Sequence, residues 1–301
     1  MKTLISGSSG LVGSALIPRL VRRGVEVRTL VRRPAVNGHD IRWDPREEVL
    51  PALALEGIDG VVHLAGENIA DGRWTEAKQR RIRDSRIDGT RLLCERLAQA
   101  RDKPSVLVCA SAVGIYGDRG DERLDERSTP GSSFLADVCE AWEAACQPAR
   151  DAGIRVVNLR IGVVLSADGG ALAKMLPPFR FGLAGKLGSG AQWTSWISLD
   201  DLVGAIEHAL VSEDIEGPVN AVSPNPVTNA EFTSALGRVL SRPTALTMPA
   251  IGARVVFGKL ADELLLSSVR AHPRALLASG FRFEHPDLED ALRHALGRRA
   301  G

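Results

Sequence analysis

The chain has 301 residues, of which 44% are hydrophobic and 25% are charged, a composition typical of a globular protein rather than a disordered one. Its 38 lysines and arginines nearly balance its 37 aspartates and glutamates, so no net charge favours nucleic acid or an anionic membrane. No apolar run reaches the about 18 residues of a membrane span, and the residues after Met1 do not fit a signal peptide. We therefore expect a protein that is neither exported nor membrane-spanning and that has no polyanionic partner.

The four cysteines lead to a related expectation about the compartment. Cys94, Cys109, Cys139 and Cys146 are irregularly spaced, form no C-x-x-C pair and have no neighbouring histidine at zinc-ligand spacing. We expect free thiols in a cytoplasmic protein and no metal site. Cys139 and Cys146 fall in one predicted helix and are expected in the core.

Short apolar strands alternate with helical segments along the first half of the chain. A strand at residues 3–5 runs into glycines, after which Leu11, Ala15 and Leu20 recur at helical spacing. Further strands are predicted at residues 25–31, 59–66, 106–110 and 155–160, with a charged helical segment ending near residue 100 and a helix at about 134–149. This alternation indicates an α/β fold with a Rossmann-type, doubly wound parallel sheet.

The amino-acid composition changes after Leu165. Glycine, proline and tryptophan become frequent through Trp196, and the residues from about Val222 onward are helix-rich and broken by prolines. We predict a nucleotide-binding domain at residues 1–165, to which 198–221 return, and a smaller C-terminal lobe assembled from 166–197 and 222–301.

A glycine-rich turn connects the first strand to the first helix. Gly7, Gly10 and Gly13 form a G-x-x-G-x-x-G pattern, and the missing side chains let the backbone turn sharply and approach a pyrophosphate. The helix N-terminus then offers N–H groups and a partial positive charge. A purely structural turn is the alternative, but the strand-turn-helix context favours a dinucleotide site. The residues expected to line it are Gly7, Ser8, Ser9, Gly10, Leu11, Val12 and Gly13, joined by Leu64, Ala65 and Gly66.

The end of the second strand indicates which dinucleotide binds. An NAD site usually places an acidic residue there for the ribose hydroxyls, whereas this chain has Arg32 and Arg33 after Val31. Guanidinium groups attract a 2′-phosphate and bind it in bidentate fashion. A pair of solvated arginines in a loop is the alternative. We predict NADP(H) as the cofactor.

These motifs together resemble the extended short-chain dehydrogenase/reductase family, and within it the epimerase-family, nucleoside-diphosphate-sugar epimerase-like branch. The resemblance covers essentially the whole chain, including a small C-terminal module. It is carried by the glycine turn, residues 59–66, Arg73-Trp74-Thr75 with Lys78, Ser85-Arg86-Ile87, Ser111-Ala112-Val113-Gly114, Gly114-Ile115-Tyr116-Gly117, Gly188-Ser189-Gly190 with Gln192, Trp196-Ile197 with Asp200-Asp201, residues 261–268, Gly280-Phe281 and Pro286-Asp287-Leu288.

The proton-transfer residues that the resemblance implies are missing. Typical members use a tyrosine, a lysine four residues later and a serine or threonine, but Tyr116 is the one tyrosine here and no Y-x-x-x-K motif exists. Aligning Tyr116 with the family's aromatic turn places the three usual positions at Ala112, Phe134 and Val138. None of these side chains can move a proton, so any catalysis requires a substitute.

Four side chains are candidates for that substitute. Tyr116 carries the phenol available as a proton donor, with core packing as the alternative. Ser111 is a weaker candidate that we expect to cap a strand end. Arg86, near the position of a family asparagine, is expected to attract an anionic group or to form a structural ion pair. Lys78 is expected to offer its cation to a ligand, with a solvated surface charge as the alternative.

An aromatic and amide cluster is the candidate substrate pocket, with a place in the hydrophobic core as the alternative for each member. Its residues are Trp74, Gln192, Trp193 and Trp196. His63 lies in an apolar strand and is expected to be a core histidine, not a base.

Three hypotheses for the function follow. The first is an NADP(H)-dependent oxidoreductase or epimerase-like enzyme that acts on a small polar or nucleotide-linked substrate with a noncanonical proton donor. The second is a non-catalytic NADP(H)-binding regulator, which the resemblance keeps open because relatives in plastids and bacteria are linked to cell division. The third, a structural protein without a cofactor, does not account for Arg32 and Arg33. A homodimer is left open.

Overall fold

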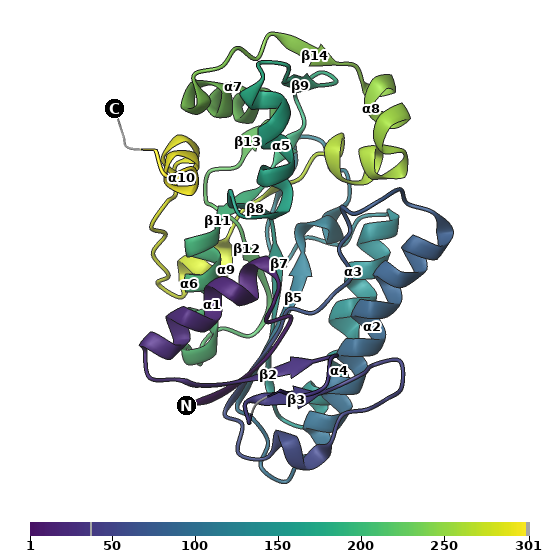
Figure 1. Ribbon diagram of the computed structural model, residues 1–301, viewed down its shortest axis with the longest axis vertical. Coiled ribbons are helices and arrows are strands. Elements are labelled where there is room, and N and C mark those ends of the chain that lie inside the picture. Colours follow the sequence, from purple (N-terminus) through teal and green to yellow (C-terminus); the bar gives the residue numbers. More distant parts are fainter. Residues whose placement is uncertain (37, 299–301) are drawn as a thin grey trace.

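The computed structural model describes residues 1–36 and 38–298, and within them the chain builds a seven-stranded central sheet in which all strands are parallel (Figure 1). From one edge to the other the strands are β12 (Gly217–Ala221), β7 (Arg155–Ile161), β5 (Val106–Ala112), β4 (Gly60–His63), β1 (Lys2–Ser6), β2 (Glu26–Val31) and β3 (Asp40–Arg42). The predicted doubly wound α/β fold is confirmed. Strand order reverses between β1 and β4, and in such sheets ligands bind at the carboxyl ends of the strands at this point.

Helices cover both faces of the sheet (Figure 1). On one face lie α1 (Leu11–Arg22) and α6 (Leu199–Val211), and on the other α2 (Glu76–Gln99), α3 (Phe134–Ala144) and α4 (Gln147–Asp151). Successive strand residues alternate between these two layers: Leu4 packs in the core under α2, whereas Ile5 packs under α1 and α6. Because both faces are covered, the central strands β4 and β5 are buried along nearly their whole length, whereas β2 and the edge strand β3 carry polar, partly exposed residues.

The predicted helix at 134–149 is divided into α3 and α4. Pro148 stands in the first turn of α4, where its missing N–H costs nothing but where it cannot continue a preceding helix. Cys139 lies in α3 and Cys146 at the N-terminus of α4, so the two cysteines belong to different helices. All four cysteines are free and buried.

The smaller lobe lies above the carboxyl ends of the strands in Figure 1. Its elements are α5 (Gly170–Arg180), β9 (Gly185–Leu187), β10 (Trp193–Thr194), β13 (Val227–Thr228), α7 (Asn229–Leu240), β14 (Leu246–Met248), α8 (Ala250–Phe257), the π-helical turn η3 (Ala261–Leu265) and α10 (Leu288–Ala295). Its own hydrophobic core forms around Trp196, Leu172 and Leu236. The division of the chain at residue 165 stays a prediction.

The remaining elements are short. They are the 3₁₀ turns η1 (Ala52–Leu55) and η2 (Val113–Tyr116), the strands β6 (Arg123–Leu124), β8 (Val163–Leu165), β11 (Trp196–Ser198) and β15 (Arg270–Ala271), and helix α9 (Arg274–Ala278). β8 pairs with β11 and β6 pairs with β15, so segments far apart in the chain are joined by backbone hydrogen bonds. Across the described ranges, no helix combines the length and apolar character needed to cross a bilayer.

Candidate functional site

The glycine turn lies at the carboxyl end of β1, against the loop that follows β4. Gly7 has φ +70°, and a Cβ atom there would stand 2.8 Å from the carbonyl carbon of Leu64. A Cβ on Gly13 would stand 2.4 Å from the Gly7 oxygen, so the turn packs directly on the helix. Ser8 and Ser9 lie in the turn and Leu11 and Val12 begin α1.

The N-terminus of α1 carries no side-chain cap in the described chain. Gly10 is its N-cap residue and contributes no side chain to the hydrogen bonding of the first turn. No acidic residue lies in that turn either. The N–H groups and the positive end of the helix dipole therefore remain available to an anion such as a pyrophosphate.

Ser6 fixes the loop after β4 against this turn. Its Oγ accepts the N–H groups of Leu64 and Ala65 at 3.1 and 3.2 Å and lies 2.7 Å from Nδ1 of His63. Since the hydroxyl accepts twice, its own proton is directed to Nδ1. Burial lowers the pKa of His63 to about 4, so the imidazole is neutral near pH 7. His63 is a core residue, as expected from the apolar strand.

The two arginines after β2 differ in their surroundings. Both are exposed, but Nη1 of Arg33 lies 2.9 Å from Oδ2 of Asp40 and also donates to the Pro34 carbonyl. A hydrogen bond from Thr29 holds the pKa of Asp40 below its ordinary value, and Arg33 adds to this effect. Arg32 has no hydrogen bond or ion pair with another described residue. Its guanidinium is therefore the less restrained of the two.

Arg86 lies beside the loop after β4. A Cβ atom on Gly66 would stand 3.2 Å from the guanidinium carbon of Arg86, which also lies 5.0 Å from the ring centroid of Trp142. Nη1 donates to the carbonyl oxygens of Glu67 and Ile82, both at 3.1 Å. Burial lowers the pKa of Arg86, and no ion pair joins it to a carboxylate among the described residues. This half-buried cation can interact with an anionic ligand.

Lys78 and Trp74, by contrast, are already partnered. Nζ of the buried Lys78 lies 2.7 Å from a carboxylate oxygen of Glu67, and this hydrogen bond holds the pKa of Glu67 below its ordinary value. The Trp74 indole donates to the Ile69 carbonyl at 2.7 Å and packs edge-on against Phe134. The positions of Lys78 and Trp74 do not support their predicted ligand contacts.

Tyr116 is fully buried at the end of η2. Its hydroxyl donates to Oδ1 of Asn220 at 2.7 Å, has the Asp125 carbonyl as a second acceptor at 3.0 Å, and accepts a hydrogen bond from Nη1 of Arg160 at 3.0 Å. Burial raises the pKa of Tyr116 despite the opposing charge of Arg160. The prediction that Tyr116 donates a proton to a substrate is not supported by this position, because the hydroxyl is enclosed and its hydrogen bonds are used within the protein.

Ser111 belongs to the same network. Its hydroxyl donates to Oε1 of Glu143 at 2.7 Å, and Glu143 forms a bidentate pair with Arg160, with both N–O distances at 2.9 Å. Burial by itself would lower the pKa of Arg160, but the hydrogen bonds and charge of Glu143 outweigh it and the pKa is raised. We call Tyr116, Ser111, Glu143, Arg160 and Asn220 the buried polar network.

The aromatic and amide residues of the lobe separate into two environments. Trp196 is fully buried in the lobe core, and Gln192 donates to two backbone carbonyl oxygens at 3.2 and 3.1 Å. Both side chains are therefore used within the protein and do not face a ligand site. Trp193 is half-buried, and the guanidinium carbon of Arg270 lies 4.0 Å from its ring centroid. Of the four predicted pocket residues, Trp193 is the one that is partly exposed, and a charged side chain lies beside it.

A polar cleft of about 670 Å³ opens between the nucleotide domain and the segment from α8 to η3. It is lined by Gly117, Asp118, Arg119, Pro130, Gly131, Ser132, Ser133, Arg254, Asp262, Glu263, Leu266 and Ser267. The two carboxylate oxygens of Glu263 accept the N–H groups of Phe134 and Leu135 at 3.2 and 3.1 Å, which ties the cleft to the first turn of α3. Sequence reasoning missed this cleft because its walls come from segments more than a hundred residues apart.

Comparison with known proteins assigns the family. Residues 3–221 match the NAD dependent epimerase/dehydratase family. The chain belongs to this family. Residues 248–295 match a further family, described as a domain of unknown function (DUF1731), in agreement with the predicted C-terminal module.

Relatives match over nearly the full length. The chain is 46% identical to epimerase family protein Mb2239 of Mycobacterium bovis, covering 98% of this chain and 97% of the relative. The crystal structure of human epimerase family protein SDR39U1 (isoform 2) with NADPH is similar at 35% identity with a TM-score of 0.91, covering 99% of both chains. A nucleoside-diphosphate sugar epimerase from Corynebacterium glutamicum matches at 40% identity and a TM-score of 0.82, covering 99% of this chain and 58% of that one.

The three positions that the sequence analysis aligned with the usual proton-transfer residues lie in β5 and α3. Ala112 is the last residue of β5, Phe134 is the first residue of α3, and Val138 follows one turn later in α3. All three lack a polar side chain.

Proposed function

We propose that this protein binds NADP(H) in the glycine turn and uses it in an oxidoreductase or epimerase-type reaction. The observation that carries the cofactor assignment is Arg32, an exposed guanidinium without a partner among the described residues, at the end of β2. A carboxylate at that position would repel a 2′-phosphate. The NADPH in the crystal structure of the human relative supports the same choice.

The polar cleft is the proposed substrate site. It adjoins the first turn of α3, and its lining contains two cations, Arg119 and Arg254, together with three acids, Asp118, Asp262 and Glu263. Such a surface suits a small polar or nucleotide-linked substrate better than an apolar one. The buried tryptophans Trp74 and Trp196 play no part in this proposal.

Arg86 is the remaining candidate for a direct chemical role. Hydride addition to a carbonyl develops negative charge on oxygen, and a fixed guanidinium stabilises that charge. Of the four side chains first considered, Arg86 alone is partly exposed, next to the cofactor loop, and without a carboxylate partner in the described chain. We expect Arg86→Met to keep NADPH affinity while lowering kcat/KM for a substrate once one is identified.

A non-catalytic, NADP(H)-binding regulator is the second candidate. It is favoured by the apolar side chains of Ala112, Phe134 and Val138 and by the enclosure of Tyr116 in the buried polar network. If carbonyl compounds oxidise bound NADPH, measured as a loss of absorbance at the nicotinamide band, the result supports the enzyme hypothesis. Tight NADPH binding with no oxidation across a broad set of sugar nucleotides and small carbonyls supports the regulator.

The cofactor assignment is tested by Arg32→Ala. A charge-assisted hydrogen bond to phosphate contributes about 1.5–3 kcal/mol, so NADPH affinity should fall about 10- to 100-fold while NADH affinity stays unchanged. Arg28→Ala is the matched control, since Arg28 lies within β2 and pairs with Glu26. Binding is measured by titration calorimetry. An equal loss for NADPH and NADH would contradict the assignment.

The glycine turn is tested by Gly10→Val. A Cβ at residue 10 already stands 3.2 Å from the Gly7 oxygen, and the larger side chain would fill the space of the pyrophosphate. NADPH and NADH binding should both be lost. Gly89→Ala, where a Cβ meets only ordinary contacts in α2, should bind both as the wild type does. Retained binding by Gly10→Val would place the cofactor elsewhere.

A further inference from the structure

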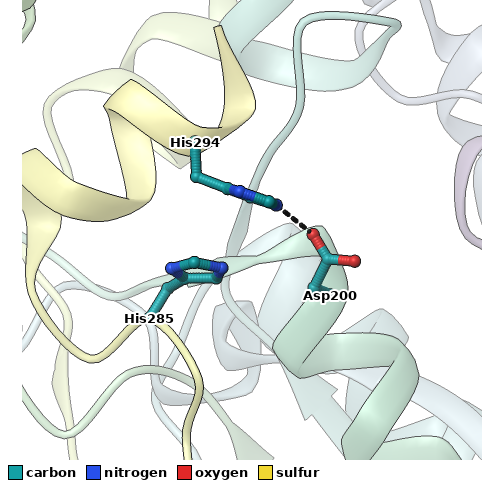
Figure 2. A group of neighbouring side chains, drawn as sticks. All are labelled: Asp200, His285 and His294. Atoms are coloured by element: carbon teal, nitrogen blue, oxygen red, sulfur yellow. Dashed lines mark hydrogen bonds and ion pairs between the residues drawn. The ribbon is translucent and has the colours of Figure 1, made fainter. Parts of the chain in front are cut away.

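Three potential metal ligands meet where α6 and the C-terminal module come together (Figure 2). Asp200 stands in the first turn of α6, His294 stands near the end of α10, and His285 precedes α10 in the chain. One donor atom from each lies within 4.8 Å of the other two. Nothing in the sequence pattern marks this group, because its members come from separate elements.

The two imidazoles are arranged so that their nitrogens face the carboxylate. Nε2 of His294 lies 2.8 Å from Oδ2 of Asp200, and the two rings stack with centroids 4.1 Å apart at 24°. Nδ1 of His285 lies 2.8 Å from Oδ2 of Asp290. Figure 2 shows the other ring nitrogen of His285 on the side of Asp200. A histidine bound on one nitrogen by a carboxylate presents the other in a fixed orientation, as metal-binding histidines usually do.

The backbone around His285 is held in place by a separate carboxylate. Asp201, buried at the start of α6, accepts the N–H groups of Glu284 and His285 at 2.6 and 3.1 Å and also a hydrogen bond from the Ser198 hydroxyl at 2.7 Å. Asp287 caps α10 and thereby fixes the helix that carries His294. The three ligands therefore sit on rigid, mutually anchored segments.

We propose that Asp200, His285 and His294 bind a divalent transition-metal ion, with Zn²⁺ as the expected occupant. Two imidazole nitrogens and one carboxylate oxygen are a ligand set that Zn²⁺ accepts, with water in the fourth tetrahedral position. The side chains of Asp200 and His294 are about half exposed, at 47% and 50%, so the ion can enter from solvent. Bound there, the metal joins α6 of the nucleotide domain to α10 of the C-terminal module and acts as a stabilising link.

The test uses the full chain after treatment with a chelator and its removal. Zn²⁺ is titrated by calorimetry, Co²⁺ is added to follow its visible absorption, and the Tm is measured with and without Zn²⁺. We expect one ion per chain and a higher Tm with Zn²⁺. His294→Gln and Asp200→Asn should each abolish both effects, and Asp290→Asn should weaken binding about 10- to 100-fold through His285.

His272→Gln is the matched control, because His272 is exposed and lies outside the group. It should bind Zn²⁺ as the wild type does. Absence of stoichiometric binding by the wild type, or equal binding by the wild type, His294→Gln and Asp200→Asn, would overturn the proposal. The group would then be a set of histidine–carboxylate hydrogen bonds. If one ligand variant fails to fold, the other decides the outcome.

Discussion

The glycine turn and the buried polar network both lie near the carboxyl ends of the central strands, yet they use polar groups in opposite ways. At the turn, the first N–H groups of α1 have no side-chain cap in the described chain. In the network, the Tyr116 hydroxyl, the Ser111 hydroxyl and the Arg160 guanidinium all bond to protein groups. The first region leaves polar groups available to a ligand, whereas the second uses its polar groups within the protein.

Arg160→Met is expected to have the largest effect on the network. Removing one partner of a buried ion pair leaves Glu143 with an uncompensated charge, which costs about 3–5 kcal/mol of unfolding free energy. The side chains of Arg160 and Glu143 are only 7% and 13% exposed, so solvent screens the pair little. The measurement is denaturant unfolding, with NADPH affinity determined on the folded variant and expected to be unchanged.

Two comparisons sharpen this prediction. Arg238 forms a pair with Glu289 in which the side chains are 58% and 32% exposed, so Arg238→Met should cost about 1 kcal/mol or less. The double variant Arg160→Met with Glu143→Leu should recover much of the lost stability, because the orphaned charge is gone. An Arg160→Met protein as stable as the wild type would show that the network is not a source of stability.

The buried histidine His63 makes the stability of the folded protein depend on pH. Its pKa in the folded protein is about 4, because of burial, against an ordinary value of 6.5. The unfolded chain therefore takes up this proton first as pH falls, so stability is full above about 6.5 and is lost progressively down to about 4. This difference corresponds to about 3 kcal/mol.

The check is unfolding free energy against pH for the wild type and His63→Asn. The amide oxygen of asparagine can accept the Ser6 hydrogen bond but does not titrate, so the slope between pH 6.5 and 4 should be smaller in the variant. Equal slopes for the two proteins would show that His63 does not carry the effect.

Among the stability changes expected for Arg160, His63 and Tyr116, that of Tyr116→Phe should be the smallest. This variant also tests most directly whether the buried polar network is independent of cofactor binding. Loss of the hydroxyl leaves buried hydrogen-bonding groups of Asn220 and Arg160 without this partner, at a cost of about 1–3 kcal/mol in stability. NADPH affinity and any NADPH oxidation should persist. Normal stability combined with loss of NADPH oxidation would instead restore Tyr116 as the proton donor.

The sequence by itself determined the parallel sheet and the glycine turn. Strand and helix periodicity is a local property, and Gly7, Gly10 and Gly13 are recognisable by their G-x-x-G-x-x-G spacing between a strand and a helix. The character of His63 as a core residue also followed from its apolar strand. These inferences succeeded because the physical cause lies within a few residues of the chain or in the regular packing of a doubly wound sheet.

Only the tertiary structure decided which polar side chains are available to a ligand. Tyr116 is enclosed by Asn220, a residue 104 positions away, and Lys78 is paired with Glu67 across a loop. The same packing leaves Arg86 without a carboxylate partner among the described residues and brings His285 and His294 to Asp200. Pairings of this kind depend on how distant elements meet, and neither composition nor spacing along the chain encodes that geometry.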